Sequence, residues 1–515
     1  MRRITSVFVA SAVLAGLVGF PAFADVKVPP IFSDNMVLQR QVEIPVWGTA
    51  TPGEEVTVAL ETETVTTKAD RSGKWLVHLK PREAGGNYTL IIRGNNILSF
   101  TRVMVGEVWV CSGQSNMEWP LKLANNAEAE IAAANDKALR GIVIKKAISS
   151  KPTSELSGSW AICTPEVAGD FSAVAYFFAK HLRETLNVPV GLIMTYWGGT
   201  PAEAWTEASF LQSDPDFEPL LRRWNENLGK VQANLDEFEK SFKVWKNESI
   251  KAENEGRPVG DPPKTPDDPR RSPHRPTGLY NAMISPLLPY AMRGAIWYQG
   301  ESNAGRAYQY RKLFPAMINS WRKAWGQGDF PFLFVQLANF TPTFPEPRES
   351  AWAELREAQT MTLSLPNTGM AVIIDIGEAG DIHPRNKQDV GKRLGLQAEK
   401  IVYGREVAAS GPMYESMQIE EGKIRIKFKH ADNGLSAKDG DLKGFAIAGE
   451  DHKFVWANAV IEGDSVVVSA EGVAKPVEVR YAWDDNPVCN LYNGAGLPAC
   501  PFRTDDWPGK TINEK

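Results

Sequence analysis

Cysteine and histidine are scarce in this sequence, with four cysteines and six histidines among 515 residues. Four cysteines are too few for a disulfide-dense scaffold, and no spacing among them matches a zinc site. Strong charge of either sign is also absent, because the formal net charge is only -5. This balance argues against nucleic acid or an anionic membrane as a partner. The composition therefore describes an ordinary globular protein with no predicted metal site.

Long apolar runs are missing except near the start, where Val7 to Phe20 follows Arg2-Arg3 and precedes Ala22-Phe23-Ala24. A charged segment, an apolar segment and a small-x-small site in this order predict a signal peptide over residues 1–24. The apolar run is too short for a comfortable membrane span. We expect a bacterial protein exported to the periplasm or the medium, with a mature chain near Asp25 onward and no membrane span; an uncleaved anchor is the alternative.

The few cysteines have different expected roles. Cys489 and Cys500 flank a loop that contains glycine and proline, and they are placed to close it as a disulfide. Cys111 lies within an apolar run and is expected to be a buried free thiol.

The length of 515 residues predicts several domains. Residues 25–105 alternate apolar and polar side chains with a period of two between turn clusters, which predicts an N-terminal β-sandwich. Residues 404–515 return to this pattern and predict a C-terminal β region. Sixteen tryptophans would suit the faces of sugars, although a core position is the ordinary expectation for each of them.

Between these regions, residues 106–403 alternate buried strands with helical patterns. This order predicts an α/β fold with a parallel sheet covered on both faces, whose sites form at the carboxyl ends of the strands. Residues 211–276 interrupt the pattern with charged helices and then a proline-rich loop. We interpret them as an insertion, which either caps the site or extends into solvent.

The stretch Gly106 to Pro120 is the centre of the predicted site. Its apolar, β-branched first half predicts a buried strand, and Ser115 follows the strand where a helix can begin. A serine there is well placed for nucleophilic chemistry, since backbone N–H groups can stabilise an oxyanion. An ordinary turn or N-cap serine is the alternative that Gly-Gln-Ser alone leaves open.

A serine nucleophile needs a base and a group that orients the base. Among the six histidines only His383 closely follows a buried strand of the α/β region. Asp381, two residues earlier, is close enough in a loop to accept from the ring Nδ1–H and fix its tautomer. Asp375 and Glu378 are second choices for this role.

Oxyanion donors are expected from the other strand ends. The backbone N–H of Ser115 is one candidate, and Gly198 or Gly199 supplies a second, because glycine lets the backbone approach a substrate closely. A side-chain amide is expected from Gln299 or else Asn303.

These segments resemble the blocks of the SGNH/GDSL hydrolase superfamily, and specifically its carbohydrate-esterase branch typified by sialate O-acetylesterase. The resemblance covers nearly the whole mature chain. It rests on four ordered motifs: Gly113-Gln-Ser-Asn-Met117, Trp197-Gly-Gly-Thr200, Trp297-Tyr-Gln-Gly-Glu-Ser-Asn303 and Asp381-Ile-His-Pro-Arg-Asn-Lys387. The carboxylate, Asp381, stands two residues before the histidine, as is usual in this branch, whereas three is usual in the superfamily as a whole. The displaced asparagine of the third block makes Gln299 a replacement donor.

The resemblance implies a flavodoxin-like sheet and hydrolysis of O-acetyl esters on a carbohydrate, with a sialate as the first expectation, without metal or cofactor. Ser115 attacks the acetyl carbonyl, His383 transfers the proton, and water releases acetate from an acetyl-serine. Neighbouring side chains in the motifs are then expected to contact the sugar: Gln114, Asn116, Trp197, Glu301, Arg306 and Arg385.

Two alternatives remain open. The same motifs occur in acetyl-xylan esterases and other plant-polysaccharide deacetylases; a sialate enzyme would place an arginine such as Arg306 or Arg385 beside the site, although solvated surface is the ordinary expectation for each. From another class, the protein could be a carbohydrate-binding module with an inert hydrolase fold. The sequence does not give the oligomeric state.

Overall fold

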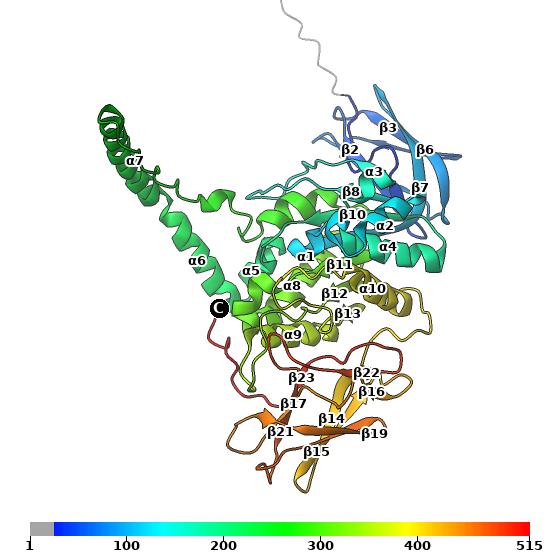
Figure 1. Ribbon diagram of the computed structural model, residues 1–515. Coiled ribbons are helices and arrows are strands. Elements are labelled where there is room, and N and C mark those ends of the chain that lie inside the picture. The colour runs from blue at the N-terminus through cyan, green and yellow to red at the C-terminus, as the bar shows by residue number, and fades with distance from the viewer. Residues whose placement is uncertain (1–24) are drawn as a thin grey trace, which may run out of the picture.

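Figure 1 shows the computed structural model, which describes residues 25–515. The predicted signal peptide, residues 1–24, lies outside the described residues. Within residues 25–515, no helix combines the length and the apolar character needed to cross a membrane.

Residues 26–113 form the N-terminal β region, in which the predicted alternation is confirmed. Strand β5 (Lys74–Leu79), for example, buries every second side chain. It pairs with β2 (Ile44–Thr49) in a two-stranded sheet. The other strands of the region join a larger sheet: β1 (Val37–Gln39), β3 (Glu55–Leu60), β4 (Glu63–Lys68) and β6 (Gly85–Arg93).

Strand β7 (Ile97–Gly113) connects this region to the rest of the molecule. It is 17 residues long and pairs with β6 in its first half. Its second half is fully buried and lies parallel to β10 (Val190–Tyr196) and β11 (Gly294–Tyr298). The boundary expected between residues 105 and 106 therefore falls inside one continuous strand.

The central sheet has the order β13-β12-β11-β7-β10-β8-β9. All neighbours in it are parallel except β8 and β9, which pair antiparallel at one edge. The sheet is thus mixed rather than wholly parallel, and the sequence did not reveal the β8–β9 pair. The remaining strands are β8 (Asp136–Val143), β9 (Trp160–Cys163), β12 (Phe332–Val335) and β13 (Thr368–Ala371).

Helices cover this sheet in pairs (Figure 1). Helix α4 (Ala173–Leu186) packs closely on α10 (Lys387–Ile401), because a Cβ at Gly391 or Gly395 would come within 2.5 Å of atoms of α4. Helix α8 (Ala307–Trp325) packs on α9 (Ala351–Met361). The side chain that caps α4 is Ser172, which accepts from the Ala175 N–H at 3.2 Å.

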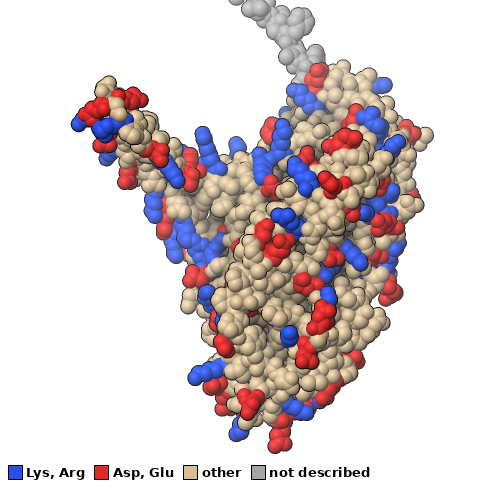
Figure 2. Space-filling view, in the orientation of Figure 1, with Lys and Arg blue, Asp and Glu red and all other residues tan. Residues whose placement is uncertain are grey.

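The segment expected to be an insertion contains a helical arm. Helix α5 (Ala208–Ser213) packs on α8, and helices α6 (Glu218–Gly229) and α7 (Val231–Asn254) then extend away from the body in succession. Figures 1 and 2 show α7 standing clear of the body, with charged side chains of both signs along it. The proline-rich chain returns along the helix, where Trp245 Nε1 donates to the Gly260 carbonyl at 2.7 Å.

The C-terminal β region has a hydrophobic core of its own. One sheet contains β14 (Met413–Glu420), β15 (Lys423–Lys429), β20 (Ser465–Ser469) and β19 (Asn458–Glu462), and the other contains β18 (Val455–Trp456), β17 (Phe445–Ala448), β21 (Glu478–Tyr481) and β23 (Phe502–Arg503). Strands β16 (Leu435–Ala437) and β22 (Leu491–Asn493) form a small third sheet. Arg356 on α9 ties this region to the α/β core by donating to the carbonyls of Leu337, Ala338, Asp484 and Asp485.

The predicted disulfide between Cys489 and Cys500 is wrong, because all four cysteines, which lie within residues 25–515, are free. Backbone bonds close the loop instead, since the Ala499 N–H donates to the Leu491 carbonyl at 2.8 Å. The Cys500 thiol lies in a buried polar setting, 3.3 Å from Thr360 Oγ1. Burial raises the pKa of Cys489 to about 12, which keeps this thiol protonated at neutral pH.

Candidate active site

Ser115 lies where the central strand turns sharply into a short helix. Strand β7 ends at Gly113, whose φ is +143° and whose added Cβ would come 2.1 Å from the Tyr298 carbonyl oxygen. Only glycine fits this close approach of β7 to the end of β11. Helix α1 (Ser115–Glu118) begins directly afterwards, so Ser115 is held at the carboxyl edge of the sheet.

Ser115 and His383 meet across the mouth of the sheet, although 268 positions separate them in the chain. The distance between Ser115 Oγ and His383 Nε2 is 2.9 Å, and both residues are half-buried. Trp119 supports the imidazole, since its ring stacks on that of His383 with centroids 5.0 Å apart. The structure therefore brings the predicted nucleophile and base together in a geometry that allows proton transfer.

The electrostatic surroundings favour a neutral imidazole. Burial lowers the pKa of His383, and the charge of Lys387 adds to this effect, whereas Asp381 acts against it. At neutral pH the ring can then accept a proton at Nε2, provided that Nδ1 carries the ring hydrogen.

Asp381 is the carboxylate next to this ring, but the contact is loose. Its Oδ1 lies 3.5 Å from His383 Nδ1 and accepts from the His383 backbone N–H at 2.9 Å. The second choices point elsewhere: Asp375 forms a two-pronged ion pair with Arg393, and Glu378 accepts from the backbone N–H of Arg385. Of these three carboxylates, Asp381 is therefore the one that lies beside the imidazole.

The two glycines after β10 differ in what their N–H groups contact. The Gly198 N–H donates to Glu118 Oε2 at 2.7 Å, and the other carboxylate oxygen binds Lys146 Nζ at 2.6 Å. Gly199 is exposed and has a φ of +74°. Within residues 25–515 no acceptor pairs with the backbone N–H of Gly199 or of Ser115. These two groups are thus free to bind an oxyanion, whereas Gly198 is occupied.

Gln299 does not offer an amide hydrogen to the nucleophile, so this part of the prediction is wrong. Its Nε2 donates to the Thr200 carbonyl at 3.3 Å and to Asn303 Oδ1 at 2.7 Å. Asn303 in turn donates to Glu203 Oε2 at 2.9 Å and is buried. Because both amides are engaged in one network, they hold the loops after β10 and β11 together.

The side chain of Lys387 is buried next to the site. Lys387 is fully buried and donates to Asn116 Oδ1 at 2.6 Å. The Asn116 amide donates to the Ile382 carbonyl at 3.0 Å and to Glu301 Oε1 at 2.6 Å. Burial lowers the pKa of Lys387 to about 7 and raises that of Glu301. The Asn116 side chain thus joins helix α1, the loop that carries His383 and the loop after β11.

Most side chains predicted to contact a sugar have other partners. Asn116 and Glu301 belong to the network around Lys387. The carbonyl of the Gln114 side chain accepts from the Gly300 and Ser302 N–H groups. The Arg306 guanidinium is paired with Glu203 at 2.5 Å. These four side chains therefore have protein partners in the structure, and their contact with a sugar stays a prediction.

Two predicted contacts remain at the surface. Trp197 is half-buried, and Lys146 Nζ lies 5.5 Å from its ring centroid. Arg385 is exposed, and its guanidinium has no partner among residues 25–515. Both lie within motifs that also carry the glycines or the histidine, so they can reach a ligand bound there.

The sequence reasoning assigned no role to Glu118, Trp119 and Lys387. One signal was available for Lys387, because it is the first residue of α10, where the helix dipole disfavours a cation. A lysine at that position must have another reason to be there. For Glu118 and Trp119 the sequence carried no comparable signal, since their partners come from distant loops. Within residues 25–515, no group of histidine, cysteine and carboxylate side chains could hold a metal ion.

Comparison with known proteins agrees with this geometry. Residues 271–399 match the family described as carbohydrate esterase, sialic acid-specific acetylesterase. Human sialate O-acetylesterase is 30% identical, with 93% of each chain covered, and the rat enzyme is 31% identical over 92% of this chain and 93% of its own. A crystal structure of a carbohydrate acetylesterase from Xanthomonas citri superimposes with a TM-score of 0.80 and 40% identity, covering 94% of this chain and 100% of the other.

Proposed function

Because the chain belongs to the family of sialate O-acetylesterases, we propose that it removes O-acetyl groups from carbohydrates through an acetyl-serine intermediate on Ser115. The observation that carries the proposal is the distance of 2.9 Å between Ser115 Oγ and His383 Nε2 at the carboxyl edge of the central sheet. We also assign the core to the SGNH type of hydrolase, on the four motifs at its strand ends.

In the first half of the reaction, Ser115 Oγ attacks the carbonyl carbon of the acetyl group while His383 Nε2 takes the hydroxyl proton. The carbonyl oxygen becomes an oxyanion, to which the free backbone N–H groups of Ser115 and Gly199 donate. The bond between this carbon and the sugar oxygen then breaks. His383 returns its proton to that oxygen, so the sugar leaves as a neutral alcohol.

In the second half, water attacks the acetyl-serine as His383 takes one of its protons. The ester bond to Ser115 breaks, the serine recovers its proton, and acetate leaves. Asp381 orients the ring and offsets the positive charge that it carries between the two transfers. Its contact of 3.5 Å to Nδ1 must shorten for full effect, and its partly exposed loop permits this movement.

For the sugar, O-acetylated sialic acid is the first candidate, because two relatives with nearly full coverage carry that activity in their names. The exposed guanidinium of Arg385 would then bind the sialate carboxylate. A neutral acetylated polysaccharide such as acetyl-xylan is the second candidate. It is favoured by the pairing of Arg306 with Glu203, which removes one of the two arginines expected to bind an anion.

The test compares acetate release from O-acetylated sialic acid and from acetylated xylan by the purified mature chain. The Arg385→Ala variant tells the two sugars apart: it should raise the KM for the sialate severalfold and leave that for xylan unchanged. Release from neither sugar, by a protein that still hydrolyses p-nitrophenyl acetate, would contradict the carbohydrate assignment. We further propose export of the chain on the predicted signal peptide, which detection of a shortened mature chain in the periplasm or medium would test.

A further inference from the structure

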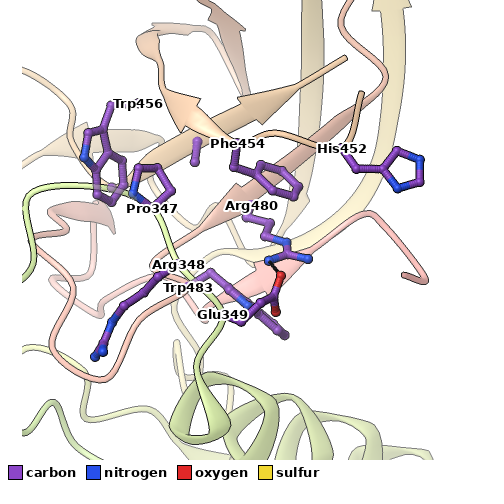
Figure 3. Close-up of a pocket in the computed structure, with 10 residues that line it drawn as sticks. Pro347, Arg348, Glu349, His452, Phe454, Trp456, Arg480 and Trp483 are labelled. Atoms are coloured by element: carbon purple, nitrogen blue, oxygen red, sulfur yellow. Dashed lines mark hydrogen bonds and ion pairs between the residues drawn. The ribbon is translucent and has the colours of Figure 1, made fainter. Parts of the chain in front are cut away.

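A groove lined by aromatic side chains crosses the C-terminal β region, away from Ser115. It consists of two adjoining pockets, of about 230 and 270 Å³, that share Gly444 and Trp456 as walls. Figure 3 shows the first pocket, where side chains of the C-terminal strands face the segment that leads into α9. Pockets of this size can each accommodate part of a small ligand.

Trp456 is an exposed but fixed platform between the two pockets. Its side chain is 42% exposed, although its Nε1 donates to the Pro345 carbonyl at 2.6 Å. The indole N–H is thus anchored while the residue remains substantially exposed to solvent. Phe344, also 42% exposed, lines the second pocket, and the Arg348 guanidinium lies 3.4 Å from its ring centroid.

The charged groups of the first pocket are held rigidly and neutralised. Arg348 pairs with Asp484 and Asp485 at 2.7 Å each. Arg480 pairs with the buried Asp505 and with Glu349, also at 2.7 Å. Since each guanidinium has carboxylate partners, the pocket has no excess positive charge for an anionic ligand.

Hydrogen-bonding capacity nevertheless remains beside the aromatic surface. Among the described residues, Arg348 Nη1 and Glu349 Oε2 have no partner, and Glu349 is 45% exposed. A fixed aromatic face flanked by planar donors and acceptors suits a pyranose ring, whose C–H face packs on the ring while its hydroxyls bind the polar groups.

We propose that this groove binds a neutral polysaccharide, with successive pyranose rings on either side of Trp456. The neutral charge excludes a sialate as the preferred ligand, and the two pockets flanking one indole favour a chain over a single sugar. The choice of a sugar rests on the proposed function, since the chain belongs to a carbohydrate esterase family. Bound there, a polymer would stay at the enzyme while the Ser115 site acts on its acetyl groups.

Affinity electrophoresis tests the proposal, with the full mature chain carrying Ser115→Ala so that the polymer is not deacetylated. Native gels contain acetylated xylan, acetylated glucomannan or hydroxyethyl cellulose. We expect retardation by at least one polymer, and about tenfold weaker binding when Trp456→Ala is added. The matched control is Phe242→Ala, which removes an equally exposed ring on α7 and should bind as before.

A second variant distinguishes stacking of a sugar on the Trp456 ring from the effect of the Trp456 bond on the loop that contains Pro345. Trp456→Phe keeps a ring but loses the bond to Pro345, and we expect it to retain binding within about threefold. Loss in this variant equal to that in Trp456→Ala would overturn the proposal, as would unchanged binding in Trp456→Ala or no retardation by any polymer. A change of oligomeric state in Trp456→Ala would also overturn it, because the groove would then be a protein interface.

The two proposals fail separately. If wild-type protein releases no acetate from any sugar but the Ser115→Ala chain binds polymer through Trp456, only the esterase proposal falls. If the wild type is active and Trp456→Ala changes neither binding nor the KM for polymer, only the groove assignment falls. Trp456→Ala should hydrolyse p-nitrophenyl acetate at the wild-type rate in either case.

Discussion

Lys387 Nζ lies 2.6 Å from Asn116 Oδ1, so a fully buried ammonium touches the side chain next to the nucleophile. The same charge contributes to the lowered pKa of His383. The residue therefore has a positional and an electrostatic effect on the site, and the two can be separated by experiment.

Lys387→Met should shift the acidic limb of the pH profile of kcat/KM to higher pH. Only the neutral form of His383 acts as a base, and removing the nearby charge raises its pKa, so more alkaline conditions are needed. Lys387, whose pKa is about 7, still carries its charge at the lower pH of this limb. Hydrolysis of p-nitrophenyl acetate between about pH 4.5 and 8 measures the shift against an unperturbed histidine pKa of about 6.5. Lys392→Met, on the exposed face of the same helix, is the control, and an unshifted limb in folded Lys387→Met would contradict the prediction.

Asp381→Asn should shift the acidic limb of the pH profile of kcat/KM to lower pH. Asp381 raises the pKa of His383, so its removal lowers that pKa. We expect kcat to fall by about 10- to 100-fold, less than the roughly 10⁴-fold typical of a tightly bonded aspartate, since the contact to Nδ1 is 3.5 Å. Glu378→Gln is the matched control, as its carboxylate caps the Arg385 N–H instead. A loss as large as that in His383→Ala would show that the contact tightens in the reacting complex.

Ser115→Ala should reduce kcat for p-nitrophenyl acetate by about 10⁴- to 10⁶-fold without unfolding the protein. Ser112→Ala is the control three residues earlier. The Ser112 hydroxyl is buried without a partner in the described chain, so its removal should preserve activity and raise the free energy of unfolding by about 1 kcal/mol. Retained turnover in a folded Ser115→Ala protein would refute the nucleophile.

Gly198→Ala should lower kcat/KM by more than about tenfold, because its Cβ would lie 3.2 Å from the Cβ of Ser115 and 3.3 Å from Glu118 Oε2. Crowding there displaces the nucleophile and strains the contact that positions the glycine loop. Gly305→Ala, where an added Cβ meets no atom within 4 Å, is the comparison and should be neutral. Equal kcat/KM for Gly198→Ala and Gly305→Ala would contradict the prediction, because the loop that contains Gly198 would then accommodate the added methyl group without displacing Ser115.

The parts of the site that follow strand ends could be predicted from the sequence. Ser115 comes two residues after β7, and His383 lies in the loop that follows β13. Parallel strands bring the loops at their carboxyl ends to one edge of the sheet, whatever their separation in the chain. The direction of the Gln299 amide could not be predicted, because it is set by Thr200 and by Asn303 across a loop. The pairing of Lys387 with a residue 271 positions away is equally invisible to local patterns.

Similar physical reasons explain the errors in the fold. Strand periodicity identified most of the central strands, but β8 contains charged side chains such as Asp136 and Arg140, so its sequence lacks the continuous apolar run of a buried strand. The loop between Cys489 and Cys500 contains the residues of a disulfide-closed turn, yet its backbone bonds make such a link unnecessary. The arm of α6 and α7 was expected as helices, but its direction away from the body is a tertiary property.

Strand β7 has a consequence for how this enzyme is built. Its 17 residues extend about 55 Å at about 3.3 Å per residue, and its last residue stands two positions before Ser115. Ser115 thus follows the end of a strand whose first half pairs with strands of the N-terminal β region. The N-terminal β region is therefore part of the support of the active site. Because it holds the first half of β7, its removal should make the position of the Ser115 hydroxyl less well defined.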